Sequence, residues 1–211
     1  MGAFEKLWVP LSGAIVRLEP LAAEHEKGLR AAAGENDWTW MTFDAGASPD
    51  AFRRWFGALR EAAEARATAP LVTIRRTDGR VLGSTLWLEL RPEHRRVEIG
   101  GTWLACSAWG TGANVEAKLL QLEHAFSLGY QRIEFKTHPD NARSRRALEA
   151  LPAQFEGILR KHVVIRDGQP RDSAYYSVVD DDWPDVRANL DRRLQAARTD
   201  DAPEQPQPEH A

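Results

Sequence analysis

At residues 109–116 the chain reads Trp109-Gly110-Thr111-Gly112-Ala113-Asn114-Val115-Glu116. A strand-like run, Val97 to Leu104, precedes this stretch, and a run with apolar residues at helical spacing follows it. Two glycines at a strand-to-helix corner let the backbone approach a ligand closely and point amide N–H groups outward, where they add to the positive end of the helix dipole. The corner therefore predicts a site for a phosphate-bearing ligand.

A Gly-x-Gly turn is also compatible with nothing more than a tight loop, and two common phosphate-binding motifs do not fit it. A dinucleotide fingerprint needs a small residue where Val115 stands, and the phosphate loop of an NTPase ends in a Gly-Lys-Ser/Thr sequence that the chain lacks. The flanking strand and helix favour a nucleotide-containing ligand outside these two classes.

Length and composition are those of one globular domain. The chain has 211 residues, of which 43% are apolar and 28% charged, enough to bury a core without a second domain. We expect a single domain over residues 1–198 and a disordered tail over residues 199–211, because the tail is polar and dotted with prolines.

The charge and the cysteine count exclude several classes of protein. A formal net charge of −3 argues against a nucleic acid or an anionic membrane as the main partner. The single cysteine, Cys106, excludes an internal disulfide and is expected to be a buried thiol rather than a nucleophile. No His/Cys group has the spacing of a zinc site, so no metal is expected. Without an apolar run of about 18 residues or a charged-then-apolar leader, the sequence predicts a cytoplasmic protein.

The order of strand-like and helix-like runs predicts a mixed sheet. Residues 71–75 and 81–90 are expected to form a hairpin, because an Asp-Gly turn signal lies between them. Later strands, at 97–104 and 132–137, alternate with helices, which gives an α/β fold with helices on the faces of a mixed sheet. Gly100-Gly101 inside a strand predicts a bulge, where the sheet could splay to admit a ligand.

A second chemical motif stands one strand after the glycine corner, again at a helix start. Asn141 can donate and accept hydrogen bonds through its amide. Arg143, Arg145 and Arg146 gather positive charge where the helix dipole already favours anions. We assign Arg143 and Arg146 to a solvated helix face, and Asn141 and Arg145 to ligand binding.

Together the two motifs resemble those of the GNAT superfamily of N-acetyltransferases, and the resemblance extends from about Ile15 to Trp183. In that family a strand ending in Trp-Leu, here Trp103-Leu104, leads into a Gly-x-Gly loop followed by Glu-Ala, here Glu116-Ala117. The family's second motif, Asn-x-x-Ser with Leu-Glu after it, is matched at residues 141–149. The resemblance implies a GNAT-like acyl-CoA N-acyltransferase fold, with a mixed central sheet splayed near Trp103 and helices on both faces.

The flanking segments resemble one branch of the superfamily, the RimJ/RimL-like enzymes that acetylate the N-termini of ribosomal proteins and assorted small amines. The similar segments are Val16–Pro20, Glu98–Gly100 and Phe155–Arg160. As is typical of this branch, Leu148 occupies the place where many other GNAT enzymes carry a tyrosine that protonates the departing thiolate. The resemblance leaves the acceptor open.

The resemblance implies an acetyl-CoA-dependent N-acetyltransferase in which a primary amine attacks the thioester directly in a ternary complex. The acceptor would be a protein N-terminal α-amine or a small-molecule amine. A backbone N–H of the splayed strand would stabilise the oxyanion. The residues that would bind acetyl-CoA are Trp103, Leu104, Ala105, Gly110, Thr111, Gly112, Ala113, Asn114, Asn141, Ser144 and Arg145.

Three residues are candidates for catalysis. Glu98 is the first candidate for the general base, because it lies on the strand beside the expected thioester and a carboxylate near apolar walls can have a raised pKa. The alternative for this residue is a solvent-facing glutamate paired with Arg95 or Arg96. Asp172 is the second candidate base. Ser144 would hydrogen-bond either the departing thiolate or the cofactor chain.

The acceptor site is expected near the segment between the first two long helices. Trp38, Trp40 and Met41 lie in that segment, which lines the acceptor site in GNAT enzymes, and Trp87 with Glu89 would form its floor. A core role for Trp38 and Trp40 is equally compatible with the sequence. An aromatic acceptor site would suit a cationic or apolar-flanked amine.

Other functions are also compatible with the sequence. The chain could be a CoA-binding regulatory or interaction module without turnover, or it could transfer a longer acyl group. The expected partners are acetyl-CoA and an amine acceptor. A homodimer is a further possibility, since the apolar stripe Val186, Leu190 and Leu194 can pack on a partner or on the chain's own sheet.

Overall fold

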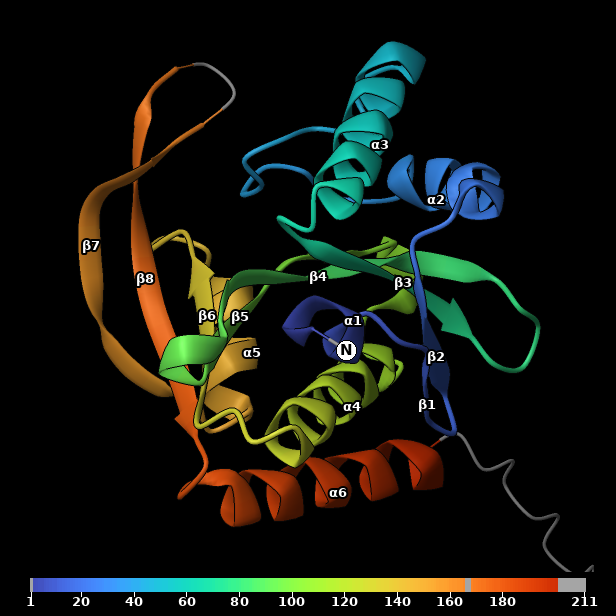
Figure 1. The fold of residues 1–211 in the computed structure, drawn as a ribbon. Coiled ribbons are helices and arrows are strands. Elements are labelled where there is room, and N and C mark those ends of the chain that lie inside the picture. The colour runs from blue at the N-terminus through green and yellow to red at the C-terminus, as the bar shows by residue number, and fades with distance from the viewer. Residues whose placement is uncertain (1, 166–167, 201–211) are drawn as a thin grey trace, which may run out of the picture.

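The computed structural model describes residues 2–165 and 168–200 and, for 198–200, the backbone alone (Figure 1). Helix α6 (Trp183–Asp200) takes up the first two residues of the tail that the sequence predicts to be disordered. The rest of that tail, 201–211, lies outside the described residues. The predicted α/β fold, a mixed sheet with helices on both faces, is confirmed (Figure 1).

Within the described residues, eight strands form one sheet in the order β1-β2-β3-β4-β5-β6-β8-β7. Neighbouring strands are antiparallel except for β5 and β6, which are parallel. A parallel pair needs a crossover connection, and helix α4 (Ala113–Ser127) supplies it. The strands are β1 (Leu11–Ser12), β2 (Val16–Pro20), β3 (Ala69–Arg75), β4 (Val81–Arg91), β5 (Arg96–Leu104), β6 (Arg132–Thr137), β7 (Gln154–Val164) and β8 (Pro170–Val179).

Helices cover the sheet on both faces and enclose two apolar cores (Figure 1). On one face, α2 (Glu26–Ala33) and α3 (Pro49–Glu64) share a core with Val72 and Ile74 of β3. On the other face, the core includes Ala69 and Leu71 of the same strand, so alternate residues of β3 are buried on opposite sides. The elements of that second face are α1 (Ala3–Leu7), α4, α5 (Ala142–Ala150) and α6, and single 3-10 turns lie at Ala23–His25, Pro92–His94 and Cys106–Ala108.

Strands β5 and β6 are joined over a short length and then part. Glu98 belongs to the last pair, and among the described residues the remainder of β5, from Ile99 to Leu104, has no strand partner on that side. On its other side β5 carries a bulge, in which Gly101 and Thr102 oppose one residue of β4. Gly101 has a φ of +55°, which glycine adopts without strain. The predicted bulge and the predicted splay near Trp103 are confirmed, and the parting begins directly after Glu98.

The buried carboxylate of Glu116 fixes the start of α4 against the first strands. Its oxygens accept hydrogen bonds from the backbone N–H groups of Ala14, Ile15 and Val16 at 2.8, 2.6 and 2.6 Å. A Cβ on Gly13 would clash with the same carboxyl group, so glycine at this position permits the close approach. Charge-assisted hydrogen bonds of this kind are strong. They hold the helix start, and with it the glycine corner, in place.

The apolar stripe of α6 packs within the chain. Val186, Leu190 and Leu194 are buried, and α6 lies against α4 (Figure 1). Of the two alternatives that the sequence left open, packing inside the chain is the one observed, and the homodimer stays a prediction. Searched over the described residues, no helix combines the length and the apolar character needed to cross a lipid bilayer.

Glu116→Ala is expected to destabilise the fold by about 3–5 kcal/mol, because three backbone N–H groups, that of Val16 buried and the other two in part-buried hydrogen bonds, lose a charged acceptor at once. Denaturation by urea, followed by circular dichroism, measures the loss. Glu123→Ala is the matched control on the same helix: its carboxylate pairs with Arg187 at 2.8 Å in an exposed place, and such a pair contributes less than about 1 kcal/mol. Equal losses in the two variants would contradict the anchoring role of Glu116.

Candidate active site

The glycine corner is a left-handed turn between the end of β5 and the start of α4. Gly110 and Gly112 both have a φ of +78°, a conformation that residues with a Cβ avoid. The hydroxyl of Thr111 donates to the carbonyl oxygen of Ala108 at 2.8 Å and closes the turn. The backbone of the turn therefore requires glycine at both positions, independently of any ligand.

The corner presents a row of backbone N–H groups without acceptors. From Gly110 to Val115, no amide donates to an acceptor among the described residues, and no side chain caps the helix. A Cβ on Gly110 would meet nothing within 4 Å, so the space beside the turn is open. These amides lie at the positive end of the α4 dipole. The arrangement can hold a phosphate group, which is the chemistry that the sequence predicts for it.

Asn141 closes the start of α5, where the second motif begins. Its side-chain oxygen accepts from the backbone N–H of Ser144 at 3.1 Å, and the residue is buried. Arg145 is used inside the protein: its Nε donates to the Tyr176 hydroxyl at 2.9 Å, and its Nη1 donates to the carbonyl of Pro139 at 3.2 Å. The guanidinium holds the loop before α5, and this placement gives no support to the predicted contact between Arg145 and the cofactor.

A stacked pair joins the starts of α4 and α5. The guanidinium carbon of Arg143, in the first turn of α5, lies 3.7 Å from the ring centre of Trp109, which stands just before the glycine corner. Trp109 is 41% exposed, an unusual state for so large an aromatic ring. The sequence assigned Arg143 to a solvated helix face. Arg143 is exposed, as that assignment predicts, and its side chain in addition covers an aromatic ring and brings a positive charge next to the corner.

The strand that leads to the corner offers its backbone rather than its side chains. Trp103, Leu104 and Ala105 are buried, and the ring of Trp103 packs against Trp38 and Trp55 at 5.0 and 5.6 Å between ring centres. The unpaired edge of β5 faces the parting of the sheet. Backbone N–H groups on an unpaired edge are free to donate to a ligand.

Glu98 is fully buried at the point where β5 and β6 part. Its carboxylate forms an ion pair with Lys136 of β6 at 3.0 Å, whereas Arg96 pairs with a different glutamate. The alternative of a solvent-facing glutamate paired with Arg95 or Arg96 is therefore wrong. Burial raises the pKa of Glu98, and the charge of Lys136 opposes that rise. Burial together with the charge of Glu98 raises the pKa of Tyr175, on β8, to about 12.

The other residues proposed for catalysis have different surroundings from Glu98. Ser144 is half-buried in the first turn of α5. Asp172 of β8 accepts a hydrogen bond from the backbone N–H of Lys161 at 2.7 Å, which ties its carboxylate to the β7–β8 hairpin. Cys106 is exposed, so the expectation of a buried thiol is wrong.

Three of the residues predicted to bind the acceptor are packing residues. Trp38 is buried and donates its indole N–H to the carbonyl of Ala33 at 2.9 Å. Trp87 is fully buried in the core on the α4 side of the sheet. Met41 is half-buried against the α2–α3 core. Trp38 and Trp87 thus pack within the protein, and their contacts with an acceptor stay predictions.

Trp40 and Glu89 occupy positions that an acceptor could reach. The half-buried ring of Trp40 lies 4.9 Å from the ring of His138, at the end of β6. Glu89 is exposed on β4, and its charge influences the pKa values of both Glu98 and His162. Its φ of +47° is strained for a residue with a side chain, and strained backbone often accompanies function. Both residues stay predictions for the acceptor site.

Lys118 of α4 is a buried group that the sequence analysis missed. Its Nζ is hydrogen-bonded to the hydroxyls of Thr85 and Thr102 at 3.2 and 2.9 Å, and to the side-chain oxygen of Gln121 at 3.2 Å. Burial lowers its pKa to about 7. Lys118 therefore ties the bulged residue of β5 to α4. The available signal was its place four residues before the apolar Leu122, which puts it on the buried face of the helix.

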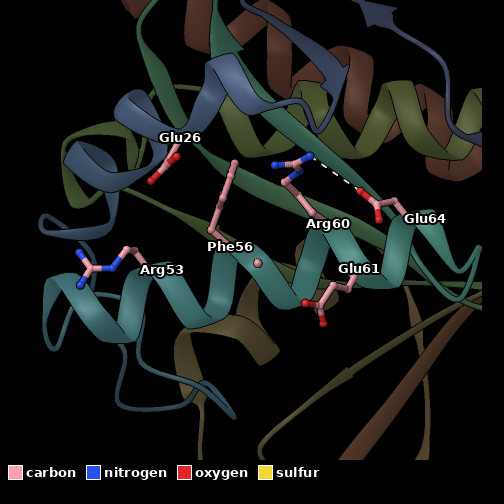
Figure 2. A pocket seen from close by; sticks show the side chains of 7 residues that line it. Glu26, Arg53, Phe56, Arg60, Glu61 and Glu64 are labelled. Atoms are coloured by element: carbon pink, nitrogen blue, oxygen red, sulfur yellow. Dashed lines mark ion pairs between the residues drawn. The ribbon is translucent and has the colours of Figure 1, made fainter.

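A surface hollow of about 390 Å³ lies between α2 and α3 and is separate from this site (Figure 2). Charged side chains of both signs surround the ring of Phe56 there, among them Glu26 and Arg53. Figure 2 shows Arg60 directed towards Glu64, with which it forms an ion pair at 3.8 Å. None of the residues singled out by the motifs lines this hollow, so it adds nothing to the chemistry of the glycine corner.

Known proteins resemble the chain over most of its length. A family model described as an acetyltransferase (GNAT) domain matches residues 16–154. The crystal structure of a GCN5-related N-acetyltransferase from Brucella melitensis matches with a TM-score of 0.81 and 32% sequence identity, over 89% of this chain and 86% of that chain. Mycobacterium smegmatis RimJ in complex with CoA-disulfide matches with a TM-score of 0.67 and 24% identity, over 90% of this chain and 93% of that chain.

A curated relative gives a match of similar identity over a shorter length. The uncharacterized N-acetyltransferase YoaA of Bacillus subtilis (strain 168) is 33% identical over 106 residues, which is 50% of this chain. The matched part covers 59% of YoaA, so the chain spans little more than half the length of that relative.

The free energy of unfolding is expected to rise with pH between about pH 7 and about pH 9 because of Lys118. In the unfolded chain a lysine has a pKa near 10.4 and keeps its proton over this range, whereas the buried amine, with a pKa of about 7, has released it. The unfolded state then binds more protons than the folded state. Stability rises by up to about 1.4 kcal/mol per pH unit.

Urea denaturation of the wild type and of Lys118→Met at several pH values measures this rise. The rise should disappear in Lys118→Met, and it should persist in Lys27→Met, which changes an exposed lysine of α2. A wild-type slope retained in Lys118→Met would contradict a neutral buried amine.

Proposed function

The chain belongs to the GNAT acetyltransferase family, and from that membership we propose that it is an acetyl-CoA-dependent N-acetyltransferase that acts on a primary amine. The observation that carries the proposal is the row of backbone N–H groups from Gly110 to Val115, which follows the strand that parts from β6. Backbone N–H groups at a helix start can bind phosphates, and the open strand edge before them can bind a thioester. This combination suits an acyl donor that carries both groups.

The residues present fit coenzyme A. The open space beside Gly110 leaves room for phosphate oxygens, and the α4 dipole favours their negative charge. The amides of Gly112 and Asn114 would donate to those oxygens, and Arg143 adds a cation beside them. The RimJ neighbour was solved in complex with CoA-disulfide, which supports this class of ligand for the present chain.

Bound acetyl-CoA would supply an activated acetyl thioester that an amine attacks directly. Backbone N–H groups on the unpaired edge of β5, from Ile99 to Leu104, would donate to the oxygen that becomes negative during the attack. The hydroxyl of Ser144 would donate to the departing sulfur, since Leu148 has no proton to offer. The protein thus contributes alignment and hydrogen-bond donors to the reaction.

Glu98 is the proposed general base. An amine must be neutral to attack, and at pH 7 an α-amine with a pKa near 8 needs about 1 kcal/mol to lose its proton, against about 4.6 kcal/mol for a lysine. Burial raises the pKa of Glu98 and brings its basicity closer to that of an amine, while the ion pair with Lys136 favours the carboxylate form. This balance suits an α-amine better than a lysine side chain.

Incubation of the protein with acetyl-CoA and a panel of primary amines is expected to release free thiol, because each transfer liberates one molecule of CoA. A colorimetric thiol assay follows the release, and mass spectrometry of the amine detects the added acetyl group. Butyryl-CoA in place of acetyl-CoA tests a longer acyl donor. CoA binding without thiol release from any amine would contradict the proposal and favour a CoA-binding module without turnover.

A pair of glycine variants separates the phosphate site from backbone strain. Gly110→Ala should raise the KM for acetyl-CoA about tenfold or more, because its Cβ would occupy the open space beside the amides. Gly79→Ala is the matched control: Gly79 has a φ of +72° and an equally open Cβ position, but lies in the β3–β4 turn. Both variants strain the backbone by about 1–2 kcal/mol. An unchanged KM in Gly110→Ala would place the phosphates elsewhere.

Glu98→Gln is expected to lower kcat/KM by about 100-fold and to remove one ionisation from its pH dependence. In the wild type, the base is lost as the pH falls through the raised pKa of Glu98, so the rate rises with pH across that range. For an acceptor amine whose pKa lies above that of Glu98, the slope of log kcat/KM against pH is measured below both of these pKa values. This slope should be smaller by about one in Glu98→Gln than in the wild type. Glu134→Gln, which changes the neighbouring β6 carboxylate, should keep the wild-type slope. An unchanged slope in Glu98→Gln would remove Glu98 from this role.

A further inference from the structure

The segment between α2 and α3 is tied to the far strands of the sheet through Trp40. The ring of Trp40 lies 4.9 Å from that of His138, and its carbonyl oxygen accepts a hydrogen bond from Nη1 of Arg171 at 3.0 Å. In Figure 1 this segment reaches from the two helices towards the β7–β8 hairpin. An extended peptide would have to displace these contacts to lie across the strands there, whereas a small molecule would not.

Glu98, Lys136 and Arg171 point to the side of the sheet where this segment lies. Val97 and Ile99 beside Glu98 and Phe135 beside Lys136 belong to the core on the α4 side. On β8 the members of that core are Ala174, Tyr176 and Val178, and Arg171 lies at the alternate positions, whose side chains face the other side of the strand. The pKa of His162, on β7, is lowered by burial and by the charges of Lys136 and Arg171. The charges of Lys136 and Arg171 therefore both act on His162, and Lys136 also pairs with the proposed base, Glu98.

Arg171 is the cation of this group that lacks a counterion. It is half-buried, its Nε–H is buried without a hydrogen-bond acceptor, and it pairs with no carboxylate of the described residues. The carboxylates of Glu98 and Glu89 are engaged with other cations, Glu98 with Lys136 and Glu89 with Arg91, each at 3.0 Å. Burial also lowers the pKa of Arg171. A partly buried guanidinium with an unused N–H is unfavourable unless an anion pairs with it.

We propose that Arg171 binds a carboxylate of the acceptor, so that the acceptor is a small molecule with both an amine and a carboxylate, as in a free amino acid. This inference rests on the proposed function, since it names the acceptor of that reaction. A guanidinium offers parallel N–H donors that match the two oxygens of a carboxylate. Nε and Nη2 of Arg171 are available for such a pair, while Nη1 stays on Trp40.

The experiment compares free amino acids with their amides as acceptors. Glycine, phenylalanine and glutamate are each assayed against the corresponding α-amide, which keeps the amine and the side chain and removes the α-carboxylate. At least one free acid should exceed its amide about tenfold in kcat/KM. This preference would run against intrinsic reactivity, because an α-amine next to an amide has a pKa of only about 8 and is neutral more often at pH 7.

Variants at Arg171 test whether that residue makes the distinction. Arg171→Gln should raise the KM for the preferred acid about tenfold or more, and should change the KM for the corresponding amide by less than about threefold. Arg171→Lys should keep part of the affinity for the acid that Arg171→Gln loses. Arg160→Gln, which changes an exposed arginine of the same β7–β8 hairpin, is the matched control and should leave both acceptors unchanged.

Binding is measured separately from turnover, so that this inference and the proposed function can fail independently. Isothermal titration of the same acids and amides into the CoA-loaded protein should show acid-selective binding that Arg171→Gln abolishes. Acid-selective binding without any acetylation would contradict the proposed function and would still support the carboxylate site at Arg171. Equal use of acids and amides, equal losses for both in Arg171→Gln, or preferential acetylation of peptide N-termini would each overturn the assignment of Arg171.

Discussion

The architecture depends on the short pairing between β5 and β6. A β-strand inside a sheet normally satisfies its backbone groups on both sides, and an unpaired edge is a liability that proteins manage. Here the pairing stops after Glu98 while β5 continues to Leu104. The bulge at Gly101 turns the strand, Lys118 ties the bulged residue to α4, and Glu116 ties α4 to the first strands. These contacts hold open an edge that the sheet would otherwise close.

Local features of this arrangement could be predicted from the sequence. Gly110 and Gly112 indicate a left-handed turn, because few other residues tolerate a positive φ. Asn141 predicts a helix start, because its side-chain oxygen can accept a hydrogen bond from a backbone N–H of the first turn. The bulge follows from adjacent glycines inside a strand. Each of these signals is contained within a few consecutive residues, so no knowledge of the tertiary structure is needed to see it.

The partners of the charged and aromatic side chains could not be predicted in the same way. Lys136 lies 38 positions after Glu98, and they meet only because β5 and β6 pair in one register. The sequence suggests Arg145 as an anion ligand, whereas in the fold its Nε donates to the hydroxyl of Tyr176 on β8. The burial of Trp87 likewise depends on which face of β4 receives α4. Local sequence patterns do not specify such contacts between distant segments.

The stacked pair of Arg143 and Trp109 affects how a ligand reaches the glycine corner. The pair joins the two helix starts on either side of the parted strands, so a molecule that approaches the amides of the corner passes beside it. An exposed cation–π contact contributes only about 0.5–1 kcal/mol, little more than thermal energy. The contact would therefore break and re-form spontaneously, so it would not block the entry of a ligand. Selectivity for whatever enters must come from the fixed amides behind it.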